Sequence, residues 1–257
     1  MIKFTSTRIL PPGKKGVIKP DENGYYTTVL GALNSLNSAG AYYPLTKEVR
    51  SLFESSSSFM RRISKGVLKA ELGHPKMEPG MTDMQYYQRI MDIREKNVCA
   101  HISEIWLDEE YGRKHPELNN PNLVAILGKV CPSGPYGYVV KQAFENPKEN
   151  CCFSIRSLTE DHWEKGRTTK VLKTIISFDW VSECGIAIAT KFHSPALEGY
   201  QEPEILEEID KPITIATLQR LVESSNGIVS MESDNILKEI YETIIVKPNK
   251  RPGYADW

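Results

Sequence analysis

Apolar and polar residues alternate along much of the middle of the chain, which is the spacing of a β-strand with one buried face. In the stretch 98–106, for example, Val98, Ala100 and Ile102 fall on one predicted face. Further apolar runs of strand length lie at 67–72, 122–130, 151–156 and 170–181. The pattern therefore predicts a protein rich in β-structure, with short helices between some of its strands.

Helical spacing is confined to a few segments. Apolar residues after Thr46 recur at intervals of three and four, although the serines at 55–58 have poor helix propensity. A capping-box pattern begins at Thr82, so we expect a helix from 83 to about 96. A third helix is expected around 139–144.

The two ends of the chain differ from the middle. The turn-forming residues 21–24 precede an apolar run, which suggests a hairpin near the N-terminus. After Pro195 the acidic stretch 198–210 resembles a linker. Helical patterns follow it at 214–223 and 233–245. We therefore expect a main domain over 1–195, and an acidic linker with a C-terminal helical tail over 196–257.

Charge and composition are those of an ordinary globular protein. The chain has 257 residues, 32 basic and 33 acidic side chains and a net charge of −1. Such a balance gives no general attraction to nucleic acid or to anionic membranes, so we expect protein partners. The sequence begins without the apolar core of a signal peptide and has no run near the ~20 apolar residues of a membrane helix. We therefore expect synthesis in the cytosol.

The five cysteines do not form a metal or redox motif. Cys99, Cys131, Cys151, Cys152 and Cys184 include no C-x-x-C pair. We expect reduced thiols that are mostly buried, and neither a metal nor a cofactor.

Serine-based acyl transfer needs a hydroxyl beside an imidazole, together with a third group that orients the imidazole. The chain offers few candidates for the base, because its only histidines are His74, His101, His115, His162 and His193. His74 follows a predicted strand and precedes a proline.

Four segments together resemble the prohead proteases of tailed phages, which are distant relatives of the herpesvirus assembly proteases. Residues 37–44 are similar to the family's N-x-x-G-x-x-Y-P segment, and residues 70–75 to its G-E-L-x-H-P motif. Residues 153–156 resemble V-S-S-R, and residues 177–181 resemble F-D-x-V. The order His, Ser, Asp is more specific than any one motif.

The resemblance implies an α+β fold, with a closed and mainly antiparallel β-barrel surrounded by helices. It also implies His74 as general base, Ser154 as nucleophile and Asp179 as the third member of a triad. Oxyanion contacts are expected from backbone N–H groups around Ile155 and Arg156, or from a side chain such as Arg156 or Arg167. The family commonly has a glycine where Ser157 stands here.

A second histidine serves as the third member in related viral proteases, so His101 is an alternative to Asp179. A thiol alternative at Cys151 or Cys152 is weaker, because a buried thiol is inert unless a nearby cation lowers its pKa. A metal-dependent hydrolase that uses Glu71 with the two histidines would lack any H-E-x-x-H spacing.

The resemblance also implies the biology. The expected substrates are scaffold or core proteins and the major capsid protein, cut inside the assembling prohead in the host cytoplasm. Cleavage is expected after glutamate with a small or aliphatic residue two places earlier. By that pattern, self-cleavage is expected after Glu232 first and Glu207 second. Self-association is an open expectation, and the alternative function is an inactive capsid or scaffold component with the same fold.

Overall fold

The computed structural model describes residues 2–8, 15–200 and 207–213. The chain divides into two compact units. One consists of Met1–Gly13 with Pro203–Trp257, and the other is Lys14–Glu202. In the first unit the described residues form a two-stranded antiparallel ribbon of β1 (Ile2–Arg8) and β12 (Glu207–Ile213).

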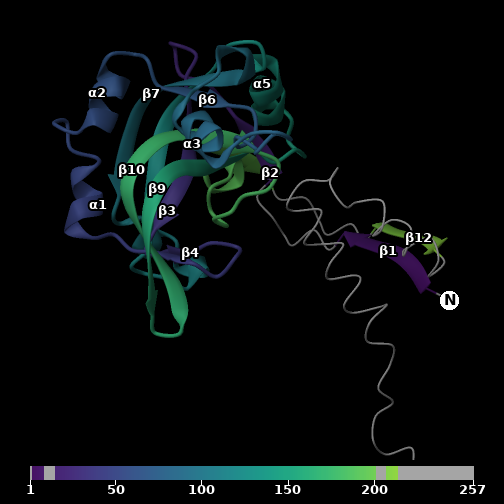
Figure 1. Cartoon of the computed structure of the whole chain (residues 1–257). Coiled ribbons are helices and arrows are strands. Elements are labelled where there is room, and N and C mark those ends of the chain that lie inside the picture. Colours follow the sequence, from purple (N-terminus) through teal and green to yellow (C-terminus); the bar gives the residue numbers. More distant parts are fainter. Residues whose placement is uncertain (1, 9–14, 201–206, 214–257) are drawn as a thin grey trace, which may run out of the picture. The chain divides into compact units, whose positions relative to one another are not determined.

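All other described elements belong to the second unit (Figure 1). Its strands are β2 (Lys15–Ile18), β3 (Tyr26–Leu33), β4 (Ser35–Leu36), β5 (Tyr42–Tyr43), β6 (Lys69–Glu71), β7 (Val98–Asp108), β8 (Val124–Pro132), β9 (Cys152–Glu164), β10 (Arg167–Val181) and β11 (Leu197–Tyr200). Its helices are α1 (Lys47–Ser51), α2 (Ser58–Ser64), α3 (Asp83–Met91), α4 (Tyr111–Lys114) and α5 (Gly137–Glu145), with 3-10 turns η1 (Glu95–Asn97), η2 (Pro116–Leu118) and η3 (Lys191–His193).

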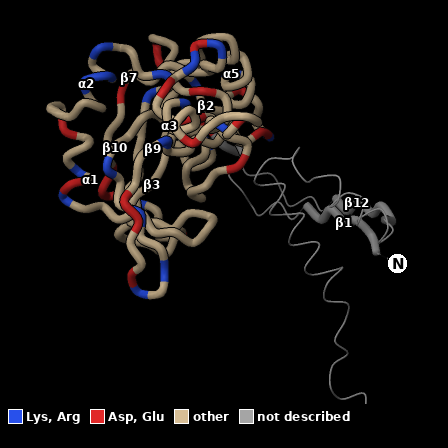
Figure 2. Tube along the Cα trace, viewed as in Figure 1, with Lys and Arg blue, Asp and Glu red and all other residues tan. Residues whose placement is uncertain are grey.

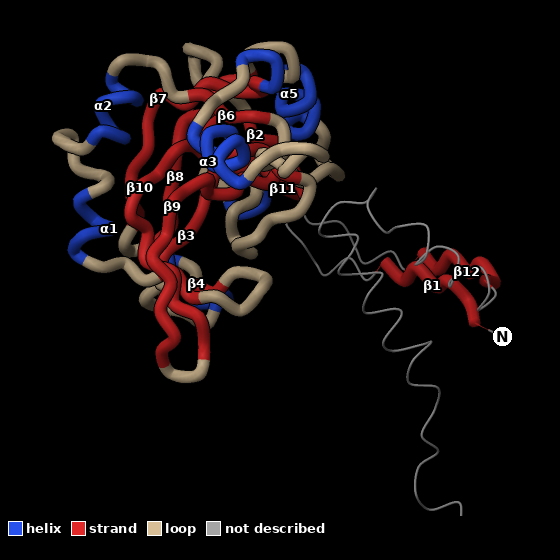
Figure 3. Tube along the Cα trace, viewed as in Figure 1, coloured by secondary structure: helices blue, strands red, loops and turns tan. Residues whose placement is uncertain are grey.

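Two four-stranded sheets make up most of this unit (Figure 3). One has the order β3-β8-β7-β6 and is antiparallel throughout. The other has the order β4-β5-β10-β9, and β9 and β10 form a long hairpin within it. The protein is therefore α+β with several antiparallel sheets, as expected. The backbone pairings of the described strands do not close into one barrel, so the predicted closed barrel is not confirmed.

The core of the unit lies between the sheets and under the helices. Phe144, Phe153 and Phe178 are fully buried in one apolar cluster. Helix α5 packs on β7 and β8, while α1 and α2 lie against β10 (Figure 1). Burying a side chain of this size stabilises the fold by about 1.5–3 kcal/mol, so these rings hold the strands that carry the site.

Several predicted elements are confirmed. Strands occupy the predicted runs at 98–106, 122–130, 151–156 and 170–181, and a helix covers 139–144. The serine-rich run divides the predicted helix after Thr46 into α1 and α2, because Ser57 caps α2 by accepting a hydrogen bond from the backbone N–H of Met60.

Two local predictions are wrong. The hairpin expected near the N-terminus, around residues 21–24, does not form, because β2 pairs with the distant β11 and not with β3. The helix expected to reach residue 96 ends at Met91, where Asp92 adopts an extended conformation with φ −96° and ψ 139°. This early end releases the carbonyl of Asp92, which is used in the site described below.

The predicted tail falls only partly within the described residues. Strands β11 and β12 occupy parts of the stretch that we expected to be a linker. The predicted helices at 214–223 and 233–245 lie outside the described residues, so the boundary at 195 remains a prediction. Charged residues of both signs are interspersed along the described chain (Figure 2). None of the helices described has the length and apolarity needed to cross a bilayer.

Candidate active site

The pairing of β9 with β10 places Ser154 directly opposite Asp179. Residues two apart on a strand share a face of the sheet, so Arg156 lies on the same face as Ser154. Residues directly opposite each other on antiparallel strands have Cβ atoms about 4.5–5.5 Å apart. The hairpin therefore gathers a hydroxyl, a carboxylate and a guanidinium on one face, away from the aromatic core.

His74 reaches the same face from a different sheet. Beyond the end of β6, Leu72 forms a parallel bridge with Trp180, and the N–H of Gly73 donates to the carbonyl of Trp180 at 2.7 Å. Gly73 has φ +78°, a conformation that residues other than glycine rarely adopt. This turn brings His74 Nδ1 to 2.9 Å from Asp179 Oδ2.

The contact fixes the role of each nitrogen of the imidazole. An ionised carboxylate only accepts hydrogen bonds, so Nδ1 of His74 carries the proton and donates. Nε2 is then free to accept a proton, which is the state that a general base requires. The His74 side chain is 41% exposed while that of Asp179 is fully buried, so one side of the ring meets solvent and the other the protein interior.

Arg156 holds Asp179 from the opposite side. Its Nε donates to Oδ2 and its Nη2 to Oδ1, both at 2.7 Å. The backbone N–H of Glu71 adds a further hydrogen bond to Oδ1 at 3.2 Å. Burial lowers the pKa of Arg156, but the hydrogen bonds and charge of Asp179, followed by those of Glu71, outweigh it and raise the pKa. The guanidinium therefore stays charged and fixes the carboxylate in one orientation.

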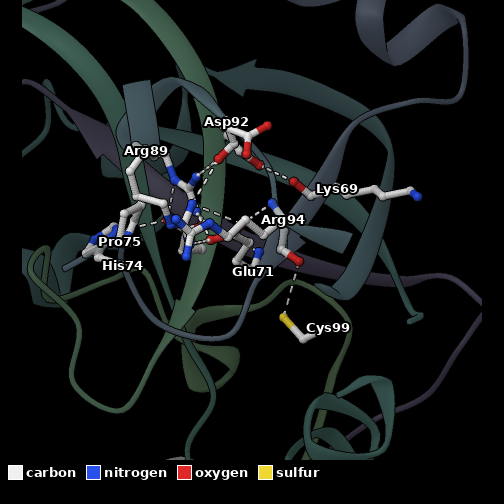
Figure 4. A network of polar contacts seen from close by, with 12 residues as sticks. Lys69, Glu71, His74, Pro75, Arg89, Asp92, Arg94 and Cys99 are labelled. Atoms are coloured by element: carbon white, nitrogen blue, oxygen red, sulfur yellow. Dashed lines mark hydrogen bonds and ion pairs between the residues drawn. The ribbon is translucent and has the colours of Figure 1, made fainter. Parts of the chain in front are cut away.

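A second carboxylate, Glu71, continues this network (Figure 4). It accepts from Arg156 Nη2 at 2.8 Å and from Arg89 Nη2 at 2.6 Å. Both arginines also donate to the carbonyl of Asp92 at 3.0 Å. Two buried cations thus balance two buried anions, which matters because an unpaired charge in the interior is very costly.

Arg89 was not among the residues predicted from the sequence. Glu71 was considered only in the weaker alternative of a metal-dependent hydrolase. Arg89 lies on α3, where periodicity alone would place an arginine on the solvent side, yet it is among the buried residues. A signal was present for Glu71, because it precedes His74 by three residues inside the segment similar to G-E-L-x-H-P.

Ser154 faces a small hollow. Its side chain is half-buried, and a Cβ built on Gly185 would lie 3.9 Å from its Oγ. The hollow has a volume of about 50 Å³ and is bounded on other sides by residues of β3 and of the loop after β4. Ser154 has no side-chain hydrogen bond within the described part of the chain, including none to His74. Catalytic hydrogen bonds are often long or absent before substrate binds.

The backbone N–H of Ile155 points away from β10, the partner strand of the hairpin. The N–H of Phe153 donates to the carbonyl of Ala189, and the carbonyl of Trp180 accepts from Gly73, so both groups point away from the β9–β10 ladder. Hydrogen-bonded and non-bonded pairs alternate along antiparallel strands. Ile155 therefore directs its N–H away from β10 as Phe153 does, toward the side of β9 where the hollow lies.

The other auxiliary candidates have different surroundings. All the polar contacts of the Arg156 side chain are to Asp179, Glu71 and the Asp92 carbonyl, so it supports the carboxylate and is not free to bind substrate. His101 is held at both ring nitrogens, by the hydroxyl of Tyr25 and the carbonyl of Gly66, each at 3.0 Å. It makes no contact with His74 or Asp179.

The thiols of Cys151 and Cys152, which precede Ser154 in the sequence, are not set up as nucleophiles. Burial raises the pKa of Cys151 to about 12, and its sulfur accepts a hydrogen bond from Trp180 Nε1. Cys152 donates to Cys184, and this hydrogen bond, together with burial, raises the pKa of Cys152. The same hydrogen bond lowers the pKa of Cys184 to about 7. The described residues hold no cluster of three metal-ligating side chains.

The two expected self-cleavage positions differ in what can be described. Glu207 is the first residue of β12, and its backbone pairs with Arg8 of β1. Glu232 lies outside the described residues. Neither position is tested by this geometry.

The sequence profile of the peptidase S80 family matches residues 4–243. The chain belongs to this family. The S80 peptidase is also 36% identical, over 250 residues, to the capsid maturation protease of Pseudomonas phage phiKZ. The two matches together confirm the resemblance to phage prohead proteases. That alignment covers 94% of this chain and 88% of the phage protein. No solved structure matches the chain with significance.

Proposed function

We propose that this S80 peptidase is a serine endopeptidase of phage capsid maturation, with Ser154 as nucleophile, His74 as general base and Asp179 as the orienting carboxylate. The observation that carries the proposal is the 2.9 Å contact between His74 Nδ1 and Asp179 Oδ2, with Ser154 opposite Asp179 on the next strand. The name of the phiKZ relative and the family membership support the biological setting.

In the proposed reaction, Nε2 of His74 takes the proton of the Ser154 hydroxyl as Oγ attacks the carbonyl carbon of the substrate peptide bond. Asp179 stabilises the imidazolium that forms, and Arg156 keeps the carboxylate in place. The N–H of Ile155 donates to the oxygen that becomes negative. His74 then returns the proton to the leaving amine, and water hydrolyses the acyl-enzyme through the same base.

The proposed substrates are scaffold or core proteins and the major capsid protein, cut after glutamate inside the assembling prohead in the host cytoplasm. Self-cleavage is proposed after Glu232, with Glu207 second. Ile102-Ser103-Glu104 also fits the pattern by letter, but it lies within β7 between β6 and β8, so cutting there would require the sheet to open. A tethered tail has a high effective concentration near its own active site, which favours self-processing.

We also propose that the two large sheets are halves of one flattened barrel. The bridge between Leu72 and Trp180 joins the end of β6 to β10. At the other end of the two sheets, a Cβ built on Gly31 of β3 would lie 3.0 Å from the side chain of Ile155 in β9. These two junctions would close the circuit β3-β8-β7-β6-β10-β9. Closure of the barrel through these two junctions would explain why Ser154 and His74 can approach each other although they come from different sheets.

The alternative is an inactive capsid or scaffold component with the same fold. The buried pair of arginines and carboxylates favours an active enzyme, because such a network costs desolvation and is not needed for stability. Replacing all four charged side chains together by apolar groups of similar volume would often give a fold that is as stable, whereas removing one charge alone would not.

The test compares the full chain with two single variants. Purified wild type is incubated with a peptide that carries Ala-x-Glu, and products are measured by mass spectrometry. Ser154→Ala should abolish cleavage, whereas Ser157→Ala, on the same strand but the opposite face, should retain it. Tail fragments beginning at Ser233 or Glu208 should form only in active chains. Cleavage by Ser154→Ala at the wild-type rate would overturn the proposal.

A further inference from the structure

The hollow beside Ser154 contains a polar side chain that has no assigned role. Asn37, in the loop between β4 and β5, lines the hollow together with Tyr43, Ile155 and Gly185. The volume of about 50 Å³ is room for a few atoms and not for a whole side chain of substrate. A hollow of that size beside a nucleophilic oxygen suits the carbonyl oxygen of the bond under attack.

The two ends of the Asn37 amide can be told apart by their partners. Oδ1 accepts hydrogen bonds from the backbone N–H of Ala39 at 3.1 Å and of Ala41 at 2.8 Å. A backbone N–H can only donate, so the atom that it meets has to be the amide oxygen and not the nitrogen. The NH₂ group is therefore on the free side of the amide, and it has two hydrogens to donate.

Neighbouring contacts hold this amide in a fixed position. The backbone of Asn37 closes a tight loop by donating to the carbonyl of Ala41 at 2.8 Å, and the N–H of Ser38 donates to the carbonyl of Gly185 at 2.7 Å. The second contact ties the Asn37 loop to the loop that lies against Ser154. Asn37 also donates to the hydroxyl of Tyr43, where burial, as the largest influence, raises the pKa of the phenol while the hydrogen bond lowers it. One hydrogen of the NH₂ group remains available.

We infer that Asn37 is a catalytic residue of this peptidase, whose Nδ2–H and the backbone N–H of Ile155 together form the oxyanion hole. The inference rests on the proposed serine mechanism. Both donors border the hollow that Ser154 faces, and neither has another partner for the hydrogen concerned within the described part of the chain. The geometry supplies one donor from the strand of the nucleophile and one from a separate loop.

The chemical step balances without any co-reactant. Oγ of Ser154 forms a bond to the carbonyl carbon, its proton passes to His74, and the π electrons of the C=O bond move to the oxygen. That oxygen gains negative charge and shortens its hydrogen bonds to the two donors. When the C–N bond breaks, the electrons return, the C=O bond forms again, and the proton on His74 leaves with the amine.

The test uses Asn37→Asp in the full chain. Aspartate has nearly the same shape and keeps an acceptor for the N–H groups of Ala39 and Ala41, but it has no hydrogen to donate. Loss of one oxyanion donor lowers kcat by about 10²- to 10³-fold in comparable enzymes. We expect a loss of that size with KM changed only a few-fold, because the donor acts on the transition state. A peptide boronate, which mimics the tetrahedral adduct, should bind more weakly by a similar factor.

A matched control separates the missing donor from the added charge. Leu36→Asp places a carboxylate one residue away, on an exposed side chain, and should keep kcat within a few-fold of wild type. If Asn37→Asp does not fold, as judged by circular dichroism, Asn37→Ser replaces it, since a serine hydroxyl can hold the same kind of turn but does not reach as far. It should show the same loss in kcat.

The outcomes distinguish this inference from the function on which it rests. If Asn37→Asp and Asn37→Ser both keep kcat within a few-fold of wild type while Ser154→Ala is inactive, Asn37 is not an oxyanion donor and the serine mechanism stands. A loss in kcat as large in Leu36→Asp as in Asn37→Asp would also overturn the inference, since charge alone would then explain it. If Ser154→Ala cleaves normally, the serine mechanism itself is wrong.

Discussion

Replacing Arg156 by methionine should remove the cation on which both buried carboxylates depend. The wild-type guanidinium makes two hydrogen bonds of 2.7 Å to Asp179 and one of 2.8 Å to Glu71, and its side chain is 3% exposed. Arg156→Met keeps the length of the side chain and loses the charge. Glu71 would retain Arg89, but Asp179 would keep only His74 and one backbone N–H.

The size of the expected loss in unfolding free energy follows from the burial of the ion pair between Arg156 and Asp179. Breaking a buried ion pair by removing one partner costs about 3–5 kcal/mol, because the remaining charge is left without compensation. For a domain of this size 1 kcal/mol shifts Tm by about 2–4 °C, so we expect Tm to fall by about 6–20 °C. Arg94→Met is the control: its ion pair with Glu78 spans 3.1 Å between partly exposed groups and should contribute at most about 1 kcal/mol.

The assay is urea unfolding followed by circular dichroism, with thermal unfolding as a second measurement. The midpoint should fall much further for Arg156→Met than for Arg94→Met, with an unchanged slope m. Equal losses within about 0.5 kcal/mol would refute the idea that the network depends on Arg156. Cleavage activity should also fall in Arg156→Met under conditions where the variant is still folded, because Asp179 would no longer be fixed.

Three further predictions concern the chemistry of the site. Asp179→Asn should lower kcat on the order of 10⁴-fold in a folded chain, because His74 would lose the acceptor that fixes its tautomer; wild-type activity would move the third role elsewhere. The cleavage rate should fall as the pH is lowered, because His74 has to be neutral to accept the proton of Ser154; a rate that does not change as the pH is lowered would exclude His74 as the base. Iodoacetamide should label Cys184 in preference to Cys151, and the rate of labelling should rise with pH through about 7. The reason is that the hydrogen bond from Cys152 lowers the pKa of Cys184 to about 7, whereas burial raises the pKa of Cys151 to about 12. Peptide mapping that found equal labelling of the two cysteines would contradict the assigned thiol pair.

The strands that carry the site could be predicted from the sequence, because their alternation is strong and local. The run at 151–156 and the run at 170–181 became β9 and β10, and their pairing brought Ser154 opposite Asp179. The turn at Gly73 and Pro75 correctly placed His74 just beyond a strand.

The partners of those residues could not be predicted, because they depend on packing between distant elements. Arg89 and Arg156 carry side chains that are normally exposed, and no local pattern marks them as buried. Their shared acceptor, the Asp92 carbonyl, is free only because α3 ends at Met91, five residues before the end that we expected from the sequence. The pairing of β2 with β11 joins segments that are far apart in the sequence. Hydrophobic periodicity describes only nearby residues, so it could not predict this pairing either.

The most direct test of the central claim is to label the folded chain with a fluorophosphonate and to map the adduct by peptide mass spectrometry. Such a reagent reacts with a serine only where a neighbouring base activates it. We predict one adduct, on Ser154, that is lost in Ser154→Ala and His74→Ala and unchanged in Ser157→Ala. A chain that cuts its substrate while Ser154 stays unlabelled, or that is labelled equally well without His74, would contradict the account.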